Sequence, residues 1–333
     1  MTAVPVAPVV LFAFNRPEHT RKVFETIRHA KPLRLLIVLD APRARVDSDQ
    51  KLCSQVLEIV SNVDWECDVD YQIAETNLGI RRRFVSGLEW AFSKVSEAII
   101  LEDDCLPSPA FFRFVSQMLS TYRNTDAIGI ISGFNPIGDF KETEYSHVFG
   151  PVPYLWGWGT WGRVWSTYDQ SASQWLNPIS RRIVRSALDT VHAYRFWTLN
   201  FNLVSKNLKY STWDYQVVFD QLLRNRLTVF PTKNLVSNIG FEYDANHTRD
   251  VSHPLASIQK HNPDLQYRDH PPVEKNPRFW NQLSRSLYRT TLLEFWVLTA
   301  LFTSRSEHFH RLVFSAVLRI KSWVSRFGVE RNG

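Results

Sequence analysis

The sequence of 333 residues lacks several features that would place it in other classes of protein. It contains no run of 18 or more uncharged apolar residues, so we expect no membrane-spanning helix. Its three cysteines, Cys53, Cys67 and Cys105, are too few for a disulfide framework and favour a reducing compartment. The first ten residues, MTAVPVAPVV, have no basic segment, so we expect no secretory signal and a cytoplasmic protein.

The chain also lacks a charge bias outside its C-terminal segment. Residues 276–333 hold nine of the 39 Lys and Arg residues and three of the 33 acidic residues. The net charge of +6 therefore belongs wholly to this segment, and residues 1–275 carry 30 charges of each sign. A neutral body argues against a nucleic-acid partner. The composition, 44% hydrophobic and 22% charged, is typical of a folded globular protein.

Apolar runs alternate with helical patterns through the first half of the chain. The patterns predict strands at 9–14, 33–40, 69–74, 98–101 and 127–132, and helices at 18–30, 50–60, 81–92 and 109–123. This alternation predicts an α/β fold with a mostly parallel sheet and helices on both faces. Ligands of such sheets bind beyond the carboxyl ends of the strands, so residues at those ends are the first candidates for a site.

The second half is less regular. Residues 134–180 are rich in Gly, Pro and aromatic residues, which predicts mostly loop. A helix is predicted from Trp213 to Arg224, a strand at 227–231 and irregular structure over 240–277. Two amphipathic helices are predicted in the basic tail, at 280–302 and 311–327.

Three consecutive acids, Glu102, Asp103 and Asp104, follow the predicted strand 98–101. Their mutual repulsion is costly unless a cation or hydrogen-bond donors offset it. Hard divalent cations such as Mg²⁺ and Mn²⁺ take oxygen ligands and often share them with phosphates. The triplet therefore suggests a metal–diphosphate site, and the alternative is a solvated turn that favours the start of the next helix.

No GxxxxGK(S/T) or GxGxxG phosphate loop occurs in the sequence. Three arginines, Arg81, Arg82 and Arg83, instead stand at the start of a predicted helix, where positive charge opposes the helix dipole. A nearby anion would explain them, and we assign Arg82 to donor binding. The alternative is a solvated basic face.

Glycine and tryptophan alternate through Trp156, Trp158, Trp161 and Trp165. Such a segment presents flat apolar surfaces on a bendable backbone, which suits a sugar face or a lid. The alternative is a loop that fills the core, and the two interpretations are compatible.

Three further residues are candidates for a site. Asp40 ends the second predicted strand, where a nucleotide commonly meets this type of sheet, or is a turn residue. Asp214 stands at the start of a predicted helix and is either a functional acid or a helix cap. His247 lies in a polar loop, as a metal ligand or as a surface histidine.

Together these residues resemble those of nucleotide-sugar glycosyltransferases of the GT-A fold. The resemblance is closest to the branch that contains N-acetylglucosaminyltransferase I and related bacterial sugar transferases, and it covers about Val9 to His247. The segment Glu102-Asp103-Asp104 is similar to the family's EDD form of the DxD motif, and the following CLPSPAFF continues the match. The opening Ala13-Phe14-Asn15-Arg16 is similar to the end of the family's first strand.

The resemblance implies a role for each matched residue. Arg16 would contact the donor nucleotide and Asp40 the uracil. Asp104 would hold Mn²⁺ or Mg²⁺, Asp103 would contact the ribose and Glu102 the donor sugar. The remaining implied residues are a catalytic base, Asp214, and a late metal ligand for which His247 is the candidate. The implied reaction is metal-dependent, inverting transfer of a sugar from a nucleoside-diphosphate donor to a glycan or lipid-linked acceptor.

Two other functions fit some of these residues. A sugar-phosphate nucleotidyltransferase would share the sheet and the acids, but it usually has a glycine-rich basic loop after the first strand. This chain has Phe14-Asn15-Arg16-Pro17-Glu18 there instead. A non-catalytic carbohydrate-binding protein could use the tryptophan segment, but it would not need the acidic triplet.

The predicted organisation is a GT-A, Rossmann-like catalytic domain over 1–250, with a nucleotide-sugar half (1–133) and an acceptor half (134–250). An irregular linker (251–277) and a basic amphipathic tail (278–333) follow. Basic and aromatic residues alternate in the tail, which suits an anionic membrane surface and a peripheral place on the inner face of the cell membrane. The alternative is a helical appendage packed on the body.

Overall fold

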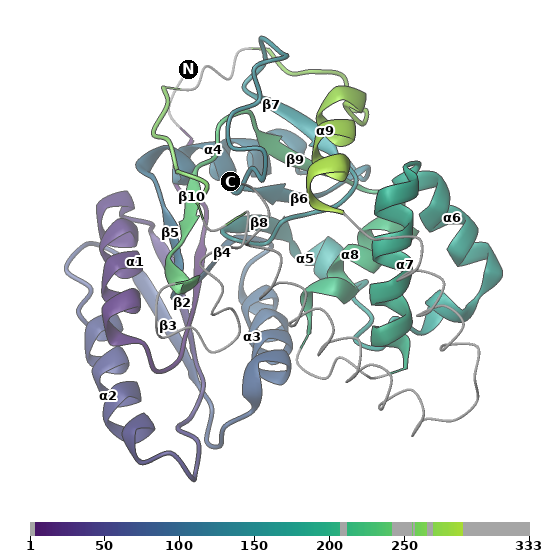
Figure 1. Cartoon of the computed structure of the whole chain (residues 1–333). Helices are drawn as coiled ribbons and strands as arrows, with labels where there is room; N and C mark the ends of the chain where they lie inside the picture. The colour runs from purple at the N-terminus through teal and green to yellow at the C-terminus, as the bar shows by residue number, and fades with distance from the viewer. Residues whose placement is uncertain (1–3, 207–211, 242–254, 256, 265–268, 289–333) are drawn as a thin grey trace, which may run out of the picture.

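The computed structural model describes residues 4–206, 212–241, 255, 257–264 and 269–288. An eight-stranded sheet runs through it in the order β3-β2-β1-β4-β8-β6-β9-β7 (Figure 1). Its strands are β1 (Val9–Ala13), β2 (Arg34–Leu39), β3 (Asp68–Ile73), β4 (Glu97–Glu102), β6 (Ile128–Ser132), β7 (His147–Gly150), β8 (Trp158–Trp161) and β9 (Leu227–Pro231). A two-stranded ribbon pairs β5 (Cys105–Pro107) with β10 (Val236–Asn238).

Six strands of the large sheet run in one direction, and β7 and β8 run against them. The helices are α1 (Pro17–Ala30), α2 (Asp47–Ser61), α3 (Gly79–Lys94), α4 (Pro109–Tyr122), α5 (Gly162–Trp165), α6 (Pro178–Leu188), α7 (Val191–Ser205), α8 (Asp214–Leu223) and α9 (Pro277–Leu287). The predicted α/β fold with a mostly parallel sheet is therefore confirmed, and so are the strands and helices of the first half.

Helices cover both faces of the sheet, and the residues of β1 show why. Val9 and Leu11 belong to a buried cluster with side chains of α1, α2 and α4. Val10 and Phe12 belong to a second cluster, with side chains of α3 and α8. Because successive side chains of a strand point to opposite faces, a strand that is apolar at every position must be covered on both sides.

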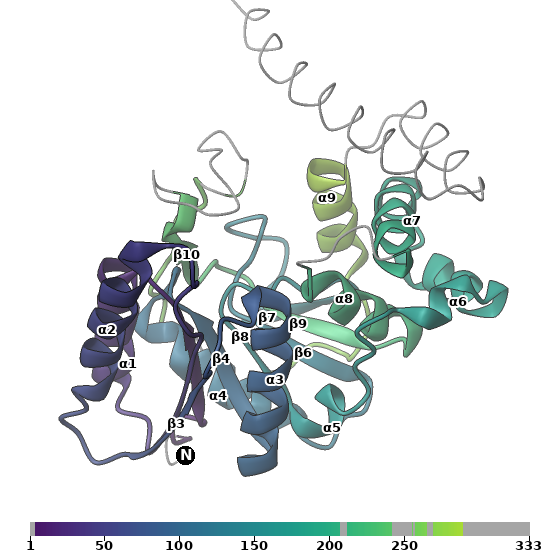
Figure 2. The same cartoon turned by 90° about the horizontal axis from the view of Figure 1, so that it is seen from below.

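A third buried cluster joins α6, α7, α8 and α9 at the end of the molecule opposite α1 and α2 (Figures 1 and 2). It is rich in aromatic residues, and α9 contributes Phe279, Trp280 and Leu283, each 1% exposed or less. The described part of the predicted tail is thus packed on the body, and the second tail helix lies outside the described residues. Within the described ranges, no helix combines the length and the apolar character needed to cross a bilayer.

Most of 134–180 is irregular, as predicted, but the prediction missed the helices and strands within the segment. This segment contains β7, β8 and α5 and the start of α6, and β8 lies in the middle of the sheet between β4 and β6. Trp158 and Trp161 are almost fully buried there. A Cβ atom on Gly159 would lie 2.5 Å from Val115, so the glycine in this strand allows α4 to pack closely on the sheet. Glycine spacing that resembles a loop therefore reflects close packing of a central strand.

Candidate active site

The acidic triplet lies at the point where the strand order of the sheet reverses. From β1 the chain continues outward to β2 and β3, and β4 then lies on the other side of β1. Phe12 of β1 is the direct partner of Glu102 of β4, so these strands end side by side. Ligands of doubly wound sheets bind in the crevice at such a switch point. Arg16 follows one of these two strand ends, and Asp103 and Asp104 follow the other.

Arg16 and the acidic turn are in direct contact. The Nη1 atom of Arg16 donates a hydrogen bond of 3.0 Å to Oδ2 of Asp104 and lies 3.7 Å from Oδ1 of Asp103. The backbone N–H of Phe14 lies 3.4 Å from the Asp103 carboxylate. Burial opposes the charge of Arg16, but the nearby carboxylates outweigh it and raise the pKa of Arg16 above its usual value. Two sequence candidates from separate strands thus form one site.

Two further acids, Glu102 and Asp214, interact through their charges. Burial raises the pKa of Glu102 well above its usual value, and the charges of Asp104, Asp103 and Asp214 add to the rise. Burial and the charge of Asp104 raise the pKa of Asp103 to about 7. Asp214, the first residue of α8, therefore lies within electrostatic reach of the end of β4. The structure brings it to the acidic turn across more than 100 residues of chain.

A column of stacked aromatic rings connects these two acids. Phe12 stacks on Phe84 with ring centroids 4.1 Å apart, and Phe84 stacks on Trp213 at 3.6 Å. Phe12 is the strand partner of Glu102, and Trp213 directly precedes Asp214. The column therefore packs Trp213, the residue before α8, against α3 and β1, the strand next to β4. None of these aromatic residues was a site candidate from the sequence.

The ribbon of β5 and β10 closes the site behind Asp104. The backbone N–H of Ile239 donates to the backbone oxygen of Asp104 at 2.8 Å. Nε2 of His19, from the first turn of α1, lies 3.1 Å from the backbone oxygen of Ile239. A Cβ atom on Gly240 would lie 2.4 Å from Oδ2 of Asp104. A larger residue at position 240 would therefore have to displace the Asp104 carboxylate, which no local pattern indicated, because the neighbour is 136 residues away.

A buried carboxylate organises the turn after β1. Asp49 is fully buried and accepts hydrogen bonds from Asn15 at 2.8 Å and from the Arg43 side chain at 2.6 and 3.0 Å. The Arg43 hydrogen bonds outweigh the cost of burial, and with Asn15 they lower the pKa of Asp49 to about 2. This network fixes Asn15, and so holds the residue before Arg16 in place. Sequence reasoning missed Asp49 because it lies just before the predicted helix 50–60 and not at the end of a predicted strand.

Asp40 connects the end of β2 to the start of α3. Its carboxylate accepts hydrogen bonds from the backbone N–H groups of Ala41, Leu78 and Gly79 and from the Asn77 side chain, at 2.9–3.2 Å. A carboxylate at a helix start stabilises it. Asp40 thereby offsets the arginines that follow in the first turn of α3, and its predicted contact with a base is untested.

The three arginines of this turn lie in different surroundings. Arg83 is buried and donates to the backbone and side-chain oxygens of Gln72, which makes it structural. Arg81 donates to the backbone oxygen of Gln170, which also accepts from Gln216 of α8. Arg82 is exposed and makes no hydrogen bond or ion pair with another described residue. It therefore has a side chain available to an anion.

The tryptophan segment mainly fills the core. Trp158, Trp161 and Trp165 are buried, as the core interpretation expects. Trp156 is partly buried against Phe134 and Phe241, with ring centroids 4.5 and 5.4 Å away. Since Phe241 follows Gly240, Trp156 is the member of the segment that lies nearest to the acidic turn along these contacts.

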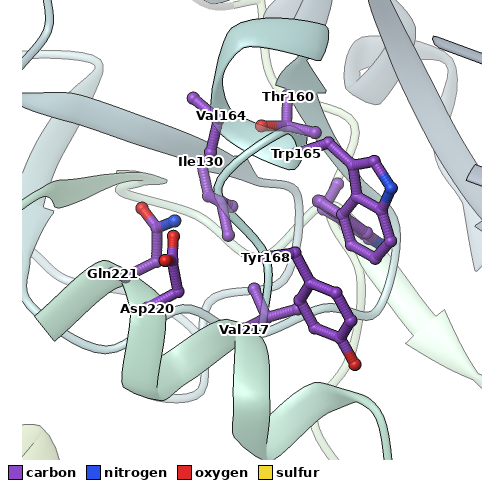
Figure 3. Close-up of a pocket in the computed structure, with 9 residues that line it drawn as sticks. Ile130, Thr160, Val164, Trp165, Tyr168, Val217, Asp220 and Gln221 are labelled. Carbon is purple, nitrogen blue, oxygen red and sulfur yellow. The ribbon is translucent and has the colours of Figure 1, made fainter. Parts of the chain in front are cut away.

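A cavity elsewhere in the body is too small for a substrate. It lies under α8, where Asp220 and Gln221 project toward Ile130 and Thr160 (Figure 3). Its volume of about 10 Å³ is close to the minimum for one water molecule. Oε1 of Gln221 is buried without a hydrogen-bond partner among the described residues, which suits such a water. This cavity is structural.

The residues of the acidic turn fit a divalent cation by their chemistry. The carboxylates of Asp103 and Asp104 lie within 4 Å of the Arg16 guanidinium, and Glu102 precedes them, so the turn concentrates hard oxygen ligands. No group of three His, Cys, Asp or Glu side chains within the described ranges is arranged to enclose a metal by itself. A cation shared with a diphosphate needs fewer protein ligands, because the phosphates supply the others. The predicted ligand His247 lies outside the described residues.

No family model matches the chain, and no curated protein matches it. One similar solved structure is a UDP-glucose pyrophosphorylase complexed with UDP-glucose, at 10% sequence identity and a TM-score of 0.35 over 69% of this chain and 92% of that chain. Another is an apo UDP-glucose pyrophosphorylase, at 9% identity and a TM-score of 0.34 over 70% and 93%. At these identities and TM-scores the two structures do not indicate the function of this chain.

Proposed function

We propose that the protein is an enzyme that binds a nucleoside-diphosphate sugar and transfers the sugar to a hydroxyl group of an acceptor. The observation that supports this most is the cluster at the switch point of the sheet. Arg16 contacts Asp104 there, and Asp214 lies within electrostatic reach of Glu102. Neighbouring acids with raised pKa values in a crevice are typical of functional sites, because a fold alone gains nothing from their repulsion.

Each residue has a task in this reaction. Bound Mn²⁺ or Mg²⁺ would neutralise the nucleoside diphosphate as it leaves, and we propose Asp104 and His247 as the residues that hold it. Arg16 places a positive charge beside Asp104, and Arg82 has an exposed guanidinium for a phosphate. Asp103 and Glu102 would orient the ribose and the donor sugar through hydrogen bonds.

Asp214 is the proposed general base. Its carboxylate takes the proton from the acceptor hydroxyl as that oxygen forms a bond to the anomeric carbon. The bond from the anomeric carbon to the phosphate oxygen breaks in the same step, and the electron pair leaves with the nucleoside diphosphate. A single displacement inverts the anomeric centre. The aromatic column from Phe12 to Trp213 supports this step because it packs the residue before Asp214 against α3 and β1, the strand next to β4.

The nucleotide and the acceptor are proposed at a coarser level. The proposal of a uridine nucleotide depends on Asp40. Its oxygens would have to exchange at least one internal hydrogen bond for a bond to the base. The proposal of a glycan or lipid-linked acceptor depends on the resemblance described above. A cytoplasmic protein that binds the inner face of the cell membrane through its basic tail is part of the same proposal.

A sugar-phosphate nucleotidyltransferase is the second candidate, and one observation favours it. The charge of Asp214 adds to the raised pKa of Glu102, so a cation at the acidic turn would be attracted by both acids, and Asp214 could assist metal binding instead of acting as a base. Metal-assisted nucleotidyl transfer uses such a pair. The turn after β1 weighs against this candidate, because Asn15-Arg16-Pro17 offers no glycine-rich cradle for a triphosphate.

One set of assays separates the candidates. The full chain is screened against UDP- and GDP-sugars with Mn²⁺ by thermal shift, since a ligand that binds the folded state raises the unfolding temperature. The best donor is then incubated alone and with pyrophosphate. Release of nucleoside diphosphate through slow hydrolysis supports glycosyl transfer, whereas pyrophosphate-dependent formation of nucleoside triphosphate and sugar 1-phosphate supports nucleotidyl transfer. No thermal shift and neither product would exclude both.

A further inference from the structure

The surface of α6 is unusually apolar for a helix at the edge of the molecule. Ile179 and Ile183 of α6 are 66% and 37% exposed, Leu176 in the turn before α6 is 61% exposed, and Val191 at the start of α7 is 58% exposed. The spacing of four residues places Ile179 and Ile183 on one side of the helix. The opposite side of α6, with Ser180, Val184 and Leu188, is buried against the body. The exposed apolar side chains are therefore a second apolar face, which the core does not use.

Basic side chains flank this face. Residues 170–206 contain five Lys or Arg residues and one acid, Asp189, which is paired with Lys275. Arg181, Arg182 and Arg185 are all on α6 and all exposed. The body is neutral as a whole, so this segment concentrates positive charge locally. Exposed apolar residues beside arginines on a helix surface are the combination that binds a lipid headgroup layer.

We propose that the face formed by Leu176, Ile179, Ile183, Arg182 and Arg185 docks on an anionic lipid bilayer. The apolar side chains would enter the boundary between headgroups and acyl chains, and the arginines would lie at the level of the phosphates. The inference does not depend on the reaction that the protein catalyses.

Charge argues for lipid over two other occupants of this face. A second copy of the chain would bring two identical basic faces together across a two-fold axis, and they would repel. The segment 289–333 holds seven Lys or Arg residues and three acids, so it would also meet the face with like charge. An anionic bilayer is complementary to both the face and that segment.

Docking through α6 would also affect the position of the proposed active site relative to the membrane. α6 packs on α8, whose first residue is Asp214, and α7 packs on α9, after which residues 289–333 follow. The three helices α6, α7 and α9 lie together in both views of the molecule (Figures 1 and 2). Docking through α6 would therefore hold the helical unit next to Asp214 against the membrane.

The test is flotation of the full chain with vesicles of phosphatidylcholine alone or with 30% phosphatidylglycerol. We expect Ile179→Gln with Ile183→Gln to lower the partition coefficient on anionic vesicles about tenfold. Arg182→Gln with Arg185→Gln should lower it about 25-fold at low salt, because each near-surface arginine contributes about fivefold, and less at high salt.

Matched controls come from the opposite end of the molecule. Leu33 is as exposed as Leu176, and Arg21 and Lys22 are exposed on α1 without ion pairs among the described residues. Leu33→Gln and the pair Arg21→Gln with Lys22→Gln should leave the partition coefficient unchanged.

Four outcomes would overturn the proposal. The first is unchanged partition of both α6 variants, and the second is an equal loss in the control variants. The third is conversion of an oligomer to a monomer by the isoleucine variant, measured by light scattering, which would assign the face to a second copy. The fourth is a lower unfolding temperature of that variant without lipid, which would show that the face is covered within the chain.

Discussion

The two ends of the molecule differ in the residues that build their cores and surfaces. The β1–β4 end is built from short aliphatic strands, and its polar residues gather where those strands end, as with Arg16 and Asp104. The end with α6, α7 and α9 is held by large aromatic residues such as Trp175 and Trp280, and its surface is basic and partly apolar. The proposed donor-binding residues thus lie on the regular half, whereas the irregular half supplies aromatic packing, a basic surface and the proposed base Asp214. Asp214 joins the two, because α8 contacts both core clusters.

The largest expected effect is that of a substitution at Asp214. Asp214→Asn should lower turnover by about 10² to 10⁴-fold, because the amide cannot accept the proton of the acceptor. Steady-state release of nucleoside diphosphate in the presence of acceptor measures this, with donor binding checked by thermal shift. Asp47→Asn is the matched control, since Asp47 is also an acid in the first turn of a helix but is exposed and has no proposed role in the reaction. Near-normal turnover with intact donor binding would remove Asp214 as the base.

A second variant tests whether the packing of α9 contributes to the stability of the body. Trp280→Ala should lower the free energy of unfolding by about 3–5 kcal/mol, because it leaves a large cavity beside Leu283. The indole N–H also donates to Leu188 and Asp189 at 2.9 Å, and that contact would be lost. Urea denaturation gives the value. A change below about 1 kcal/mol would show that α9 is only loosely attached to the body.

A smaller effect is expected behind the acidic turn. Gly240→Ala should displace the Asp104 carboxylate, because the new methyl group would lie 2.4 Å from Oδ2. Overpacking of this kind costs about 1–3 kcal/mol of stability, and metal-dependent turnover should fall with it. Gly79→Ala is the comparison: no atom lies within 4 Å of its Cβ position, so any loss there comes from its positive φ of 73°. Equal metal affinity in both variants would contradict the assignment of Asp104.

The smallest expected effect is the pH dependence of stability that His147 contributes, in the strand β7 at the edge of the sheet. His147 is buried between Tyr122 and Ser146, and burial, with the charge of His270, lowers its pKa to about 3. The unfolded chain binds a proton near pH 6.5 and the folded chain does not, so stability falls as the pH drops from about 6.5 toward 3. The slope from this group is at most about 1.4 kcal/mol per pH unit.

Urea denaturation of His147→Gln between pH 4 and 7.5 tests this expectation. The variant should lose that component of the slope, whereas the variant of an exposed histidine, His192→Gln, should keep it. An unchanged slope in His147→Gln would place the acid sensitivity in other groups.

The regular half was largely predictable. Period-two and period-3.6 patterns located the strands and helices of residues 9–132, and the acids after β4 followed from the rule that ligands bind at strand ends. The segment 134–205 was not predictable in the same way. β8 is a strand of tryptophan and glycine whose neighbours β4 and β6 decide its conformation, and α6 begins at Pro178 after a segment without clear periodicity.

The site shows the same division. The sequence alone identified the candidate site residues, since charge, strand position and the spacing of Glu102–Asp104 are local properties of the chain. Only the tertiary structure decided which of them meet: Arg16 with Asp104, Asp214 with Glu102, and Gly240 against the acidic turn. It also showed that Asp40 and Arg83 have structural partners. The physical reason is that hydrogen bonds and desolvation act over a few ångströms, and residues far apart in the chain reach that distance only after the sheet has formed.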